Sequence, residues 1–70
     1  MIKMEIKVTN RMQEDTYETI AYEAVLDGKT IGWATVMVSD EGAYLERIDI
    51  DEEYRGQGHG TAFIRALVAE

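Results

Sequence analysis

The fold is decided by residues 45–69, which read LERIDIDEEYRGQGHGTAFIRALVA. The stretch opens with apolar residues that favour a strand and passes through the glycine-rich hexapeptide RGQGHG at residues 55–60. It ends in good helix formers without Gly or Pro. It therefore predicts a strand over residues 43–51, a tight corner, and a helix over residues 61–69.

Such a corner is suited to binding an anion. Its three alternating glycines carry no Cβ, so the backbone N–H groups can turn inward as an anion-binding nest. A helix that begins near Gly60 adds unpaired N–H groups and the positive end of its dipole. A phosphate group suits these donors, and Arg55 and Thr61 can add their own. The alternative is a glycine turn that only lets the strand pack closely on its helix.

Two common phosphate loops do not match this corner. The Walker loop needs a Lys after its glycines, and no Lys follows here. The dinucleotide fingerprint needs G-x-G-x-x-G, whereas the spacing here is G-x-G-x-G.

The chain before residue 45 is rich in β patterns. Residues 2–8 alternate apolar and charged side chains and predict a first strand with one buried face. Residues 9–16 are polar and predict a connection. Residues 19–26 and 30–38 predict two more strands. They are joined by Asp27-Gly28, which is typical of a type I′ hairpin.

The apolar residues of the later strands predict which faces are buried. The strand at residues 30–38 is apolar on both faces, so we expect it to be central and covered on both sides. Ile31, Trp33 and Met37 would share one face, and Ala34, Val36 and Val38 the other. In the next strand, Tyr44, Glu46, Ile48 and Ile50 would share a face. The helix at residues 61–69 has an apolar arc too broad for one small sheet to cover.

Together these elements predict an α+β fold: a mostly antiparallel sheet of about four strands with one C-terminal helix, forming a single domain over residues 1–70. A domain this small buries only about 60% of its unfolded surface, so we expect association with another chain to stabilise it.

Composition narrows the possible partners. The net charge of −7 argues against a nucleic-acid surface. It would suit a cationic acceptor such as an amine, but the simpler explanation is that it keeps the chain soluble. The chain has no Cys and one His, so no metal site is expected. No apolar run is long enough to span a membrane, and no signal peptide is evident. The composition fits a cytoplasmic protein.

The hexapeptide resembles the signature (Arg/Gln)-x-x-G-x-(Gly/Ala) of the GNAT superfamily, the acetyl-CoA-dependent N-acyltransferases, and fits it at every fixed position. The strand before it and the helix after it are similar to that family's fourth strand and following helix. The hairpin that ends in residues 31–34 also looks like its second and third strands. A complete family domain is longer, so the chain resembles a truncated member with a partial GNAT-like fold.

The resemblance implies a set of site residues. The loop amides would hold the pyrophosphate of acetyl-CoA, and the backbone of the fourth strand would pair with the pantetheine arm. Glu46 is the candidate catalytic base, with a surface carboxylate as the alternative. The implied coenzyme-binding residues are Ile48, Asp49, Ile50, Arg55, Gly56, Gln57, Gly58, His59, Gly60 and Thr61.

The resemblance also implies a function. As an enzyme, the chain would transfer acetyl from acetyl-CoA to an amine, without a metal. Segments that shape the acceptor site in the family have no counterpart here, so a homodimer or a larger partner protein is expected to complete the site. The alternative is a non-catalytic acetyl-CoA-binding or structural module.

Overall fold

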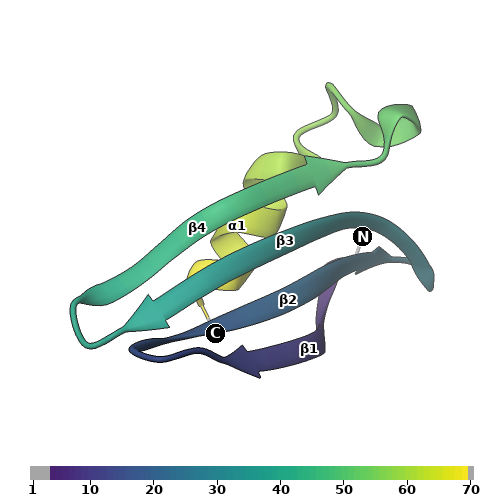
Figure 1. Ribbon diagram of the computed structural model, residues 1–70. Helices are drawn as coiled ribbons and strands as arrows, with labels where there is room; N and C mark the ends of the chain where they lie inside the picture. The colour runs from purple at the N-terminus through teal and green to yellow at the C-terminus, as the bar shows by residue number, and fades with distance from the viewer. Residues whose placement is uncertain (1–3, 70) are drawn as a thin grey trace.

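A computed structural model describes residues 4–69, which form one four-stranded sheet and a helix packed across one of its faces (Figure 1). All pairings are antiparallel, in the order β1-β2-β3-β4. The predicted α+β fold is therefore confirmed. The strands are β1 (Met4–Gln13), β2 (Tyr17–Leu26), β3 (Lys29–Ser39) and β4 (Gly42–Ile50); a 3-10 turn (Glu52–Tyr54) and α1 (His59–Val68) follow.

The turn between β2 and β3 has the predicted conformation. Asp27 has φ 49° and Gly28 has φ 83°. Both central residues of a type I′ turn need positive φ, which Asp-Gly adopts at low cost. The β2–β3 hairpin is therefore confirmed.

The first strand is longer than predicted. Residues 9–13, expected to belong to a connection, continue β1, and residues 10–13 pair with residues 18–21 of β2. They are exposed on an edge strand, so no apolar alternation marks them. Thr9 is the extra residue of a bulge, because Val8 lies opposite Tyr22 and Asn10 opposite Ala21. Residues 2 and 3 of the predicted strand lie outside the described residues.

Two more bulges change which side chains share a face. Ile31 is the extra residue of the bulge in β3, and its side chain is completely buried in the core. The prediction that Ile31 shares a face with Trp33, which is half-exposed, is therefore wrong. Glu46 is extra in β4, since Leu45 pairs with Val36 and Arg47 with Thr35.

The β4 bulge separates side chains that were predicted together. Exposed Tyr44 pairs with Met37, whereas partly buried Ile48 pairs with Ala34, on the other face of β3. The single face predicted for residues 44–50 is therefore wrong, because one inserted residue reverses the alternation of a strand.

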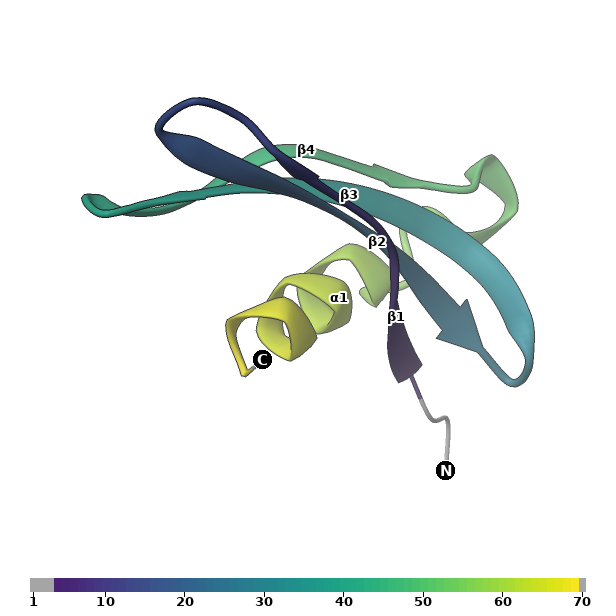
Figure 2. The ribbon, with the colours of Figure 1, turned by 60° about the horizontal axis from the view of Figure 1, so that its bottom comes forward.

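The core lies between the sheet and α1. Figure 2 shows α1 under one face of the sheet, with the opposite face uncovered. Phe63 of α1 is completely buried against side chains from β2 and β3. These are Ile20, Tyr22, Ala24, Leu26, Ile31 and Ala34.

Strand β3 is central but covered on one side only. Trp33, on the uncovered face, is 46% exposed. The prediction that both faces of β3 would be covered is therefore wrong within residues 4–69. No helix in this range is long and apolar enough to cross a membrane.

Candidate functional site

The glycine corner joins the 3-10 turn to α1 and has a left-handed backbone at two glycines. Gly56 has φ 75°, and Gly58, the N-cap of α1, has φ 82° and ψ 3°. Residues that carry a side chain rarely adopt this backbone conformation, which explains why both positions are glycine. A methyl group added at either glycine would meet no other atom within 4 Å. The corner is therefore open to the outside and is not packed against the rest of the chain.

The amides of this corner have no partner within the described chain. The first helical backbone hydrogen bond runs from the Ala62 N–H to the Gly58 carbonyl, at 3.1 Å. No side chain caps the helix. A helix N-terminus leaves its first N–H groups unpaired, and here the loop extends that row. Among residues 4–69, no protein acceptor is bound by the N–H groups of Gly56, Gln57, Gly58, His59, Gly60 and Thr61.

Two corner side chains bind the preceding backbone. The Arg55 Nε donates to the carbonyl of Ile50 at 2.8 Å, and the Gln57 Nε2 donates to the carbonyl of Glu53 at 3.1 Å. Arg55 thereby fixes the end of β4 relative to the corner. Its guanidinium carries further N–H groups, which remain available to an anion.

The helix begins two residues earlier than predicted. His59 and Gly60 belong to its first turn, because the left-handed Gly58 already ends the loop. The half-buried His59 ring meets the ring of Tyr54 edge-on, with 5.9 Å between centroids. His59 is thus held against the 3-10 turn, while Thr61 is exposed.

The end of β4 presents a free edge beside this corner. Ile48, Asp49 and Ile50 pair with β3 on one side. Within the described residues no strand pairs with the other side, so that edge offers backbone donors and acceptors. The Asp51 N–H, one residue further, donates to the Ile31 carbonyl at 2.7 Å and fixes the strand end to β3.

Glu46 lies on the bulge of β4 and is exposed. The bulge leaves it without an opposite residue in β3, so its local direction differs from that of a regular strand position. It belongs to the same strand as residues 48–50, but no contact joins it to the glycine corner among the described residues.

Sequence reasoning missed one cation beside the corner. The Lys29 Nζ lies 3.5 Å from the Glu53 carboxylate and 5.2 Å from the centre of the Tyr54 ring. The pKa of Lys29 is raised above its ordinary 10.5, first by hydrogen bonding to Tyr54 and then by the Tyr54 and Glu53 charges. The sequence held one signal that could have predicted this position of Lys29. Antiparallel pairing of β3 and β4 places the start of β3 beside the end of β4.

Lys29 matters because the corner follows an acidic stretch. Asp51, Glu52 and Glu53 directly precede it, and the Asp51 carboxylate accepts a hydrogen bond from the Glu53 N–H at 3.2 Å. These charges oppose an anion at the corner, and the Lys29 ammonium offsets part of them. Within residues 4–69, no three His, Cys, Asp or Glu side chains are grouped to hold a metal ion.

Comparison with known proteins identifies the family. A family model described as the Acetyltransferase (GNAT) family matches residues 3–70, nearly the whole chain. Searches of curated proteins and of solved structures found no match. The matched region includes both the free edge of β4 and the open glycine corner. The chain therefore belongs to the GNAT acetyltransferase family.

Proposed function

We propose that this chain binds acetyl-CoA at the glycine corner and transfers the acetyl group to an amine. The observation that carries the proposal is the row of unpaired backbone amides at residues 56–61, at the positive end of α1 and open to the outside. Diphosphate oxygens are natural acceptors for such a row. Membership of the family supports the same ligand.

The free edge of β4 would bind the rest of the coenzyme. The pantetheine arm carries amide groups, which can pair with the backbone of residues 48–50 as an added strand does. A short 3-10 turn separates this edge from the corner in the chain, and the Arg55–Ile50 hydrogen bond joins the two. One extended ligand can therefore contact both.

The transfer itself would be direct. The amine nitrogen attacks the thioester carbon, giving a tetrahedral intermediate whose oxyanion accepts a hydrogen bond from a β4 backbone N–H. Glu46 takes the proton of the amine, and the coenzyme leaves as its thiolate. Glu46→Gln is expected to lower kcat by about a hundredfold or more while leaving acetyl-CoA affinity unchanged. If the variant and the wild type have the same kcat with a panel of amines, Glu46 is not part of the mechanism.

The site would be completed by a second copy of this chain or by a larger partner protein. An apolar hollow of about 250 Å³ supports this, because it lies between β4 and α1 and is lined by Val36, Leu45, Ile64, Leu67 and Val68, among others. Leu45 is 44% exposed and Ile64 is 41% exposed. Covering these side chains would release water from apolar surface. In this proposal residues 1–70 form one acetyl-CoA-binding domain that acts in the cytoplasm.

The same exposed surface favours a second candidate function. As a non-catalytic module, the chain would bind acetyl-CoA or dock on a partner without transferring acetyl. Acetyl-transfer assays with an amine panel separate the two, since only the enzyme consumes acetyl-CoA in proportion to amine.

Calorimetry with acetyl-CoA tests the binding site directly, and Gly58 offers a matched pair of variants. Gly58→Ala and Gly58→Glu share the strain of a side chain at φ 82°. Only Glu adds bulk and negative charge beside the amides. We expect Gly58→Glu to abolish binding and Gly58→Ala to weaken it moderately. Equal affinity of Gly58→Glu and wild type would refute the site.

A further inference from the structure

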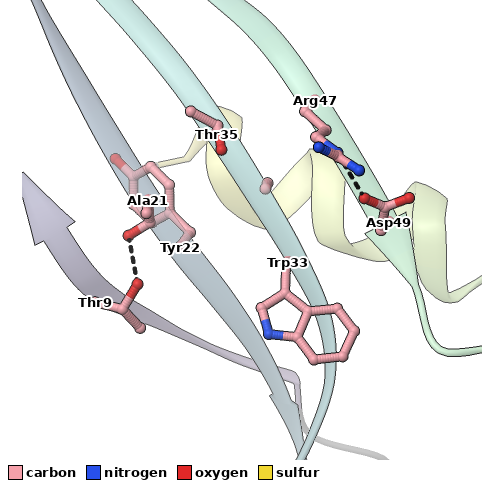
Figure 3. Close-up of a pocket in the computed structure, with 8 residues that line it drawn as sticks. Thr9, Ala21, Tyr22, Trp33, Thr35, Arg47 and Asp49 are labelled. Carbon is pink, nitrogen blue, oxygen red and sulfur yellow. Dashed lines mark hydrogen bonds and ion pairs between the residues drawn. The ribbon is translucent and has the colours of Figure 1, made fainter.

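The uncovered face of the sheet carries a hollow of its own. It has a volume of about 310 Å³ and lies on the side away from α1 (Figure 3). Six of its lining residues come from all four strands: Thr9, Ala21, Trp33, Thr35, Arg47 and Asp49. It is separate from the glycine corner.

The hollow arises from a size difference between neighbouring rows of the sheet. Ala21, Thr35 and Arg47 occupy one row, while Trp33 and Asp49 occupy the next row on the same face. The small side chains of Ala21 and Thr35 form the floor of the hollow, and the larger indole of Trp33 forms one of its sides. The Thr9 hydroxyl donates to the Ala21 carbonyl at 3.3 Å and closes the β1 side of this floor.

The charges around Trp33 favour a cation. Its direct neighbours across the strands are both carboxylates, Glu23 on β2 and Asp49 on β4. The ring is 46% exposed, so one of its surfaces is accessible to a ligand. An ammonium group can bind an aromatic ring and a carboxylate together, since both present negative potential.

Arg47 is the competing cation in this hollow. Its Nε lies 3.0 Å from the Asp49 carboxylate; the Arg47 side chain is largely exposed and that of Asp49 about half exposed. Figure 3 shows this pair on β4 and the Trp33 ring on the neighbouring strand. An incoming ammonium would share the carboxylate with Arg47 or displace it, and an exposed pair of this kind is weak enough to allow either.

We propose that this hollow binds the ammonium group of an amine, with Trp33 and Asp49 as the recognising side chains. Asp49 links the hollow to the coenzyme edge, because its side chain lines the hollow while its backbone belongs to the free edge of β4. An amine held here lies beside the strand proposed to bind the thioester arm. As the acceptor site it rests on the proposed function, whereas amine binding itself can be measured without acetyl-CoA.

The test uses 1,4-diaminobutane, with 1,4-butanediol as the uncharged control at equal ionic strength. Trp33 is the only Trp, so its fluorescence and its indole N–H signal in NMR report on the hollow directly. We expect the diamine, but not the diol, to give a saturable change. A diol that acts like the diamine, or a diamine without a saturable effect, would overturn the proposal, whether or not acetyl-CoA binds.

Three variants separate an ammonium site from other ligands. Asp49→Asn and Trp33→Leu are each expected to weaken diamine binding about two- to fivefold, followed for both by the Thr35 amide signal. Arg47→Met should strengthen it by a similar factor, because it frees the Asp49 carboxylate.

The matched control is Glu41→Gln, the same charge change at an exposed position in the β3–β4 turn, and it should leave the affinity unchanged. If Arg47→Met weakens binding, Arg47 helps to hold the diamine instead of competing with it, and the proposal fails. If Glu41→Gln weakens it as much as Asp49→Asn, only the overall charge attracts the diamine, and the proposal fails as well.

Discussion

Gly32 on β3 packs against the end of β4 without room for a side chain. A methyl group there would lie 2.8 Å from the Asp49 carbonyl oxygen and 2.8 Å from the Ile50 Cδ1. Only glycine lets β3 approach the end of β4 this closely, so Gly32 helps to set the position of the free edge of β4.

Gly32→Ala is therefore expected to destabilise the fold by about 1–3 kcal/mol, because β4 must shift away from β3. Gly60→Ala, within α1, is the matched control. Its methyl group would lie 3.9 Å from the Ile50 Cγ1, which is an ordinary contact. It should stabilise the fold by up to about 1 kcal/mol through helix propensity. Urea denaturation measures both, and equal effects of the two variants would contradict the packing described for Gly32.

Lys29 gives a prediction about pH. Its pKa is raised above the ordinary 10.5 by Tyr54 first and Glu53 second. A raised folded-state pKa means that the stability contributed by Lys29 is complete below pH 10.5 and is lost as the pH rises through the folded-state value.

An NMR titration of the Lys29 side chain between about pH 9 and 12 should give a midpoint above its ordinary value. Tyr54→Phe removes the hydroxyl and should move that midpoint downward, while Tyr44→Phe, on the exposed part of β4, should not. A wild-type midpoint at or below 10.5 would show that the contacts of Lys29 with Tyr54 and Glu53 do not form in solution.

At the scale of the elements, α1 has one completely buried side chain, that of Phe63. A ten-residue helix is marginal by itself in water, so packing has to stabilise it. Phe63 is completely buried, while Val68 on the same helix is 82% exposed.

We expect Phe63→Ala to cost about 3–5 kcal/mol, enough to unfold so small a domain, whereas Val68→Ala should change stability by less than about 0.5 kcal/mol. Circular dichroism and thermal unfolding separate the two. A folded Phe63→Ala variant with an intact α1 would show that the helix is held by contacts other than the core.

Regular patterns in the sequence were enough to predict which elements form. Alternation marked the first half of β1, Asp-Gly marked the β2–β3 turn, and the three glycines marked the corner before α1. These signals are local, so one sequence suffices to recognise them. The same signals placed residues 55–60 at a strand-to-helix corner, which the structure also has.

The bulges could not be predicted in this way. Thr9, Ile31 and Glu46 carry no local signal for an extra residue, because pairing with the neighbouring strand decides where it goes. The hollow beside Trp33 likewise depends on strand register, because the pairing of β3 with β4 places Asp49 opposite Trp33. Sequence reasoning therefore predicted the loop of the candidate site but neither the hollow beside Trp33 nor Lys29.

At the scale of the whole molecule, the apolar hollow between β4 and α1 predicts association. If a second copy covers it, sedimentation should show a dimer, and Leu45→Lys should give a monomer with an unchanged circular dichroism spectrum. Val8→Lys is the control, because Val8 is a comparably exposed apolar residue on β1. If the wild-type chain stays monomeric at high concentration, a second copy does not cover the apolar hollow, and a larger partner protein is then expected to cover it.

The most direct test of the central claim is an NMR titration with acetyl-CoA that follows the backbone amides. We expect saturable shifts concentrated at residues 56–61, with smaller ones at residues 48–50, because these amides would bind the diphosphate and the pantetheine arm. Gly58→Glu should remove the shifts at residues 56–61. Shifts spread evenly over the chain, or none at residues 56–61 in the wild type, would contradict the account.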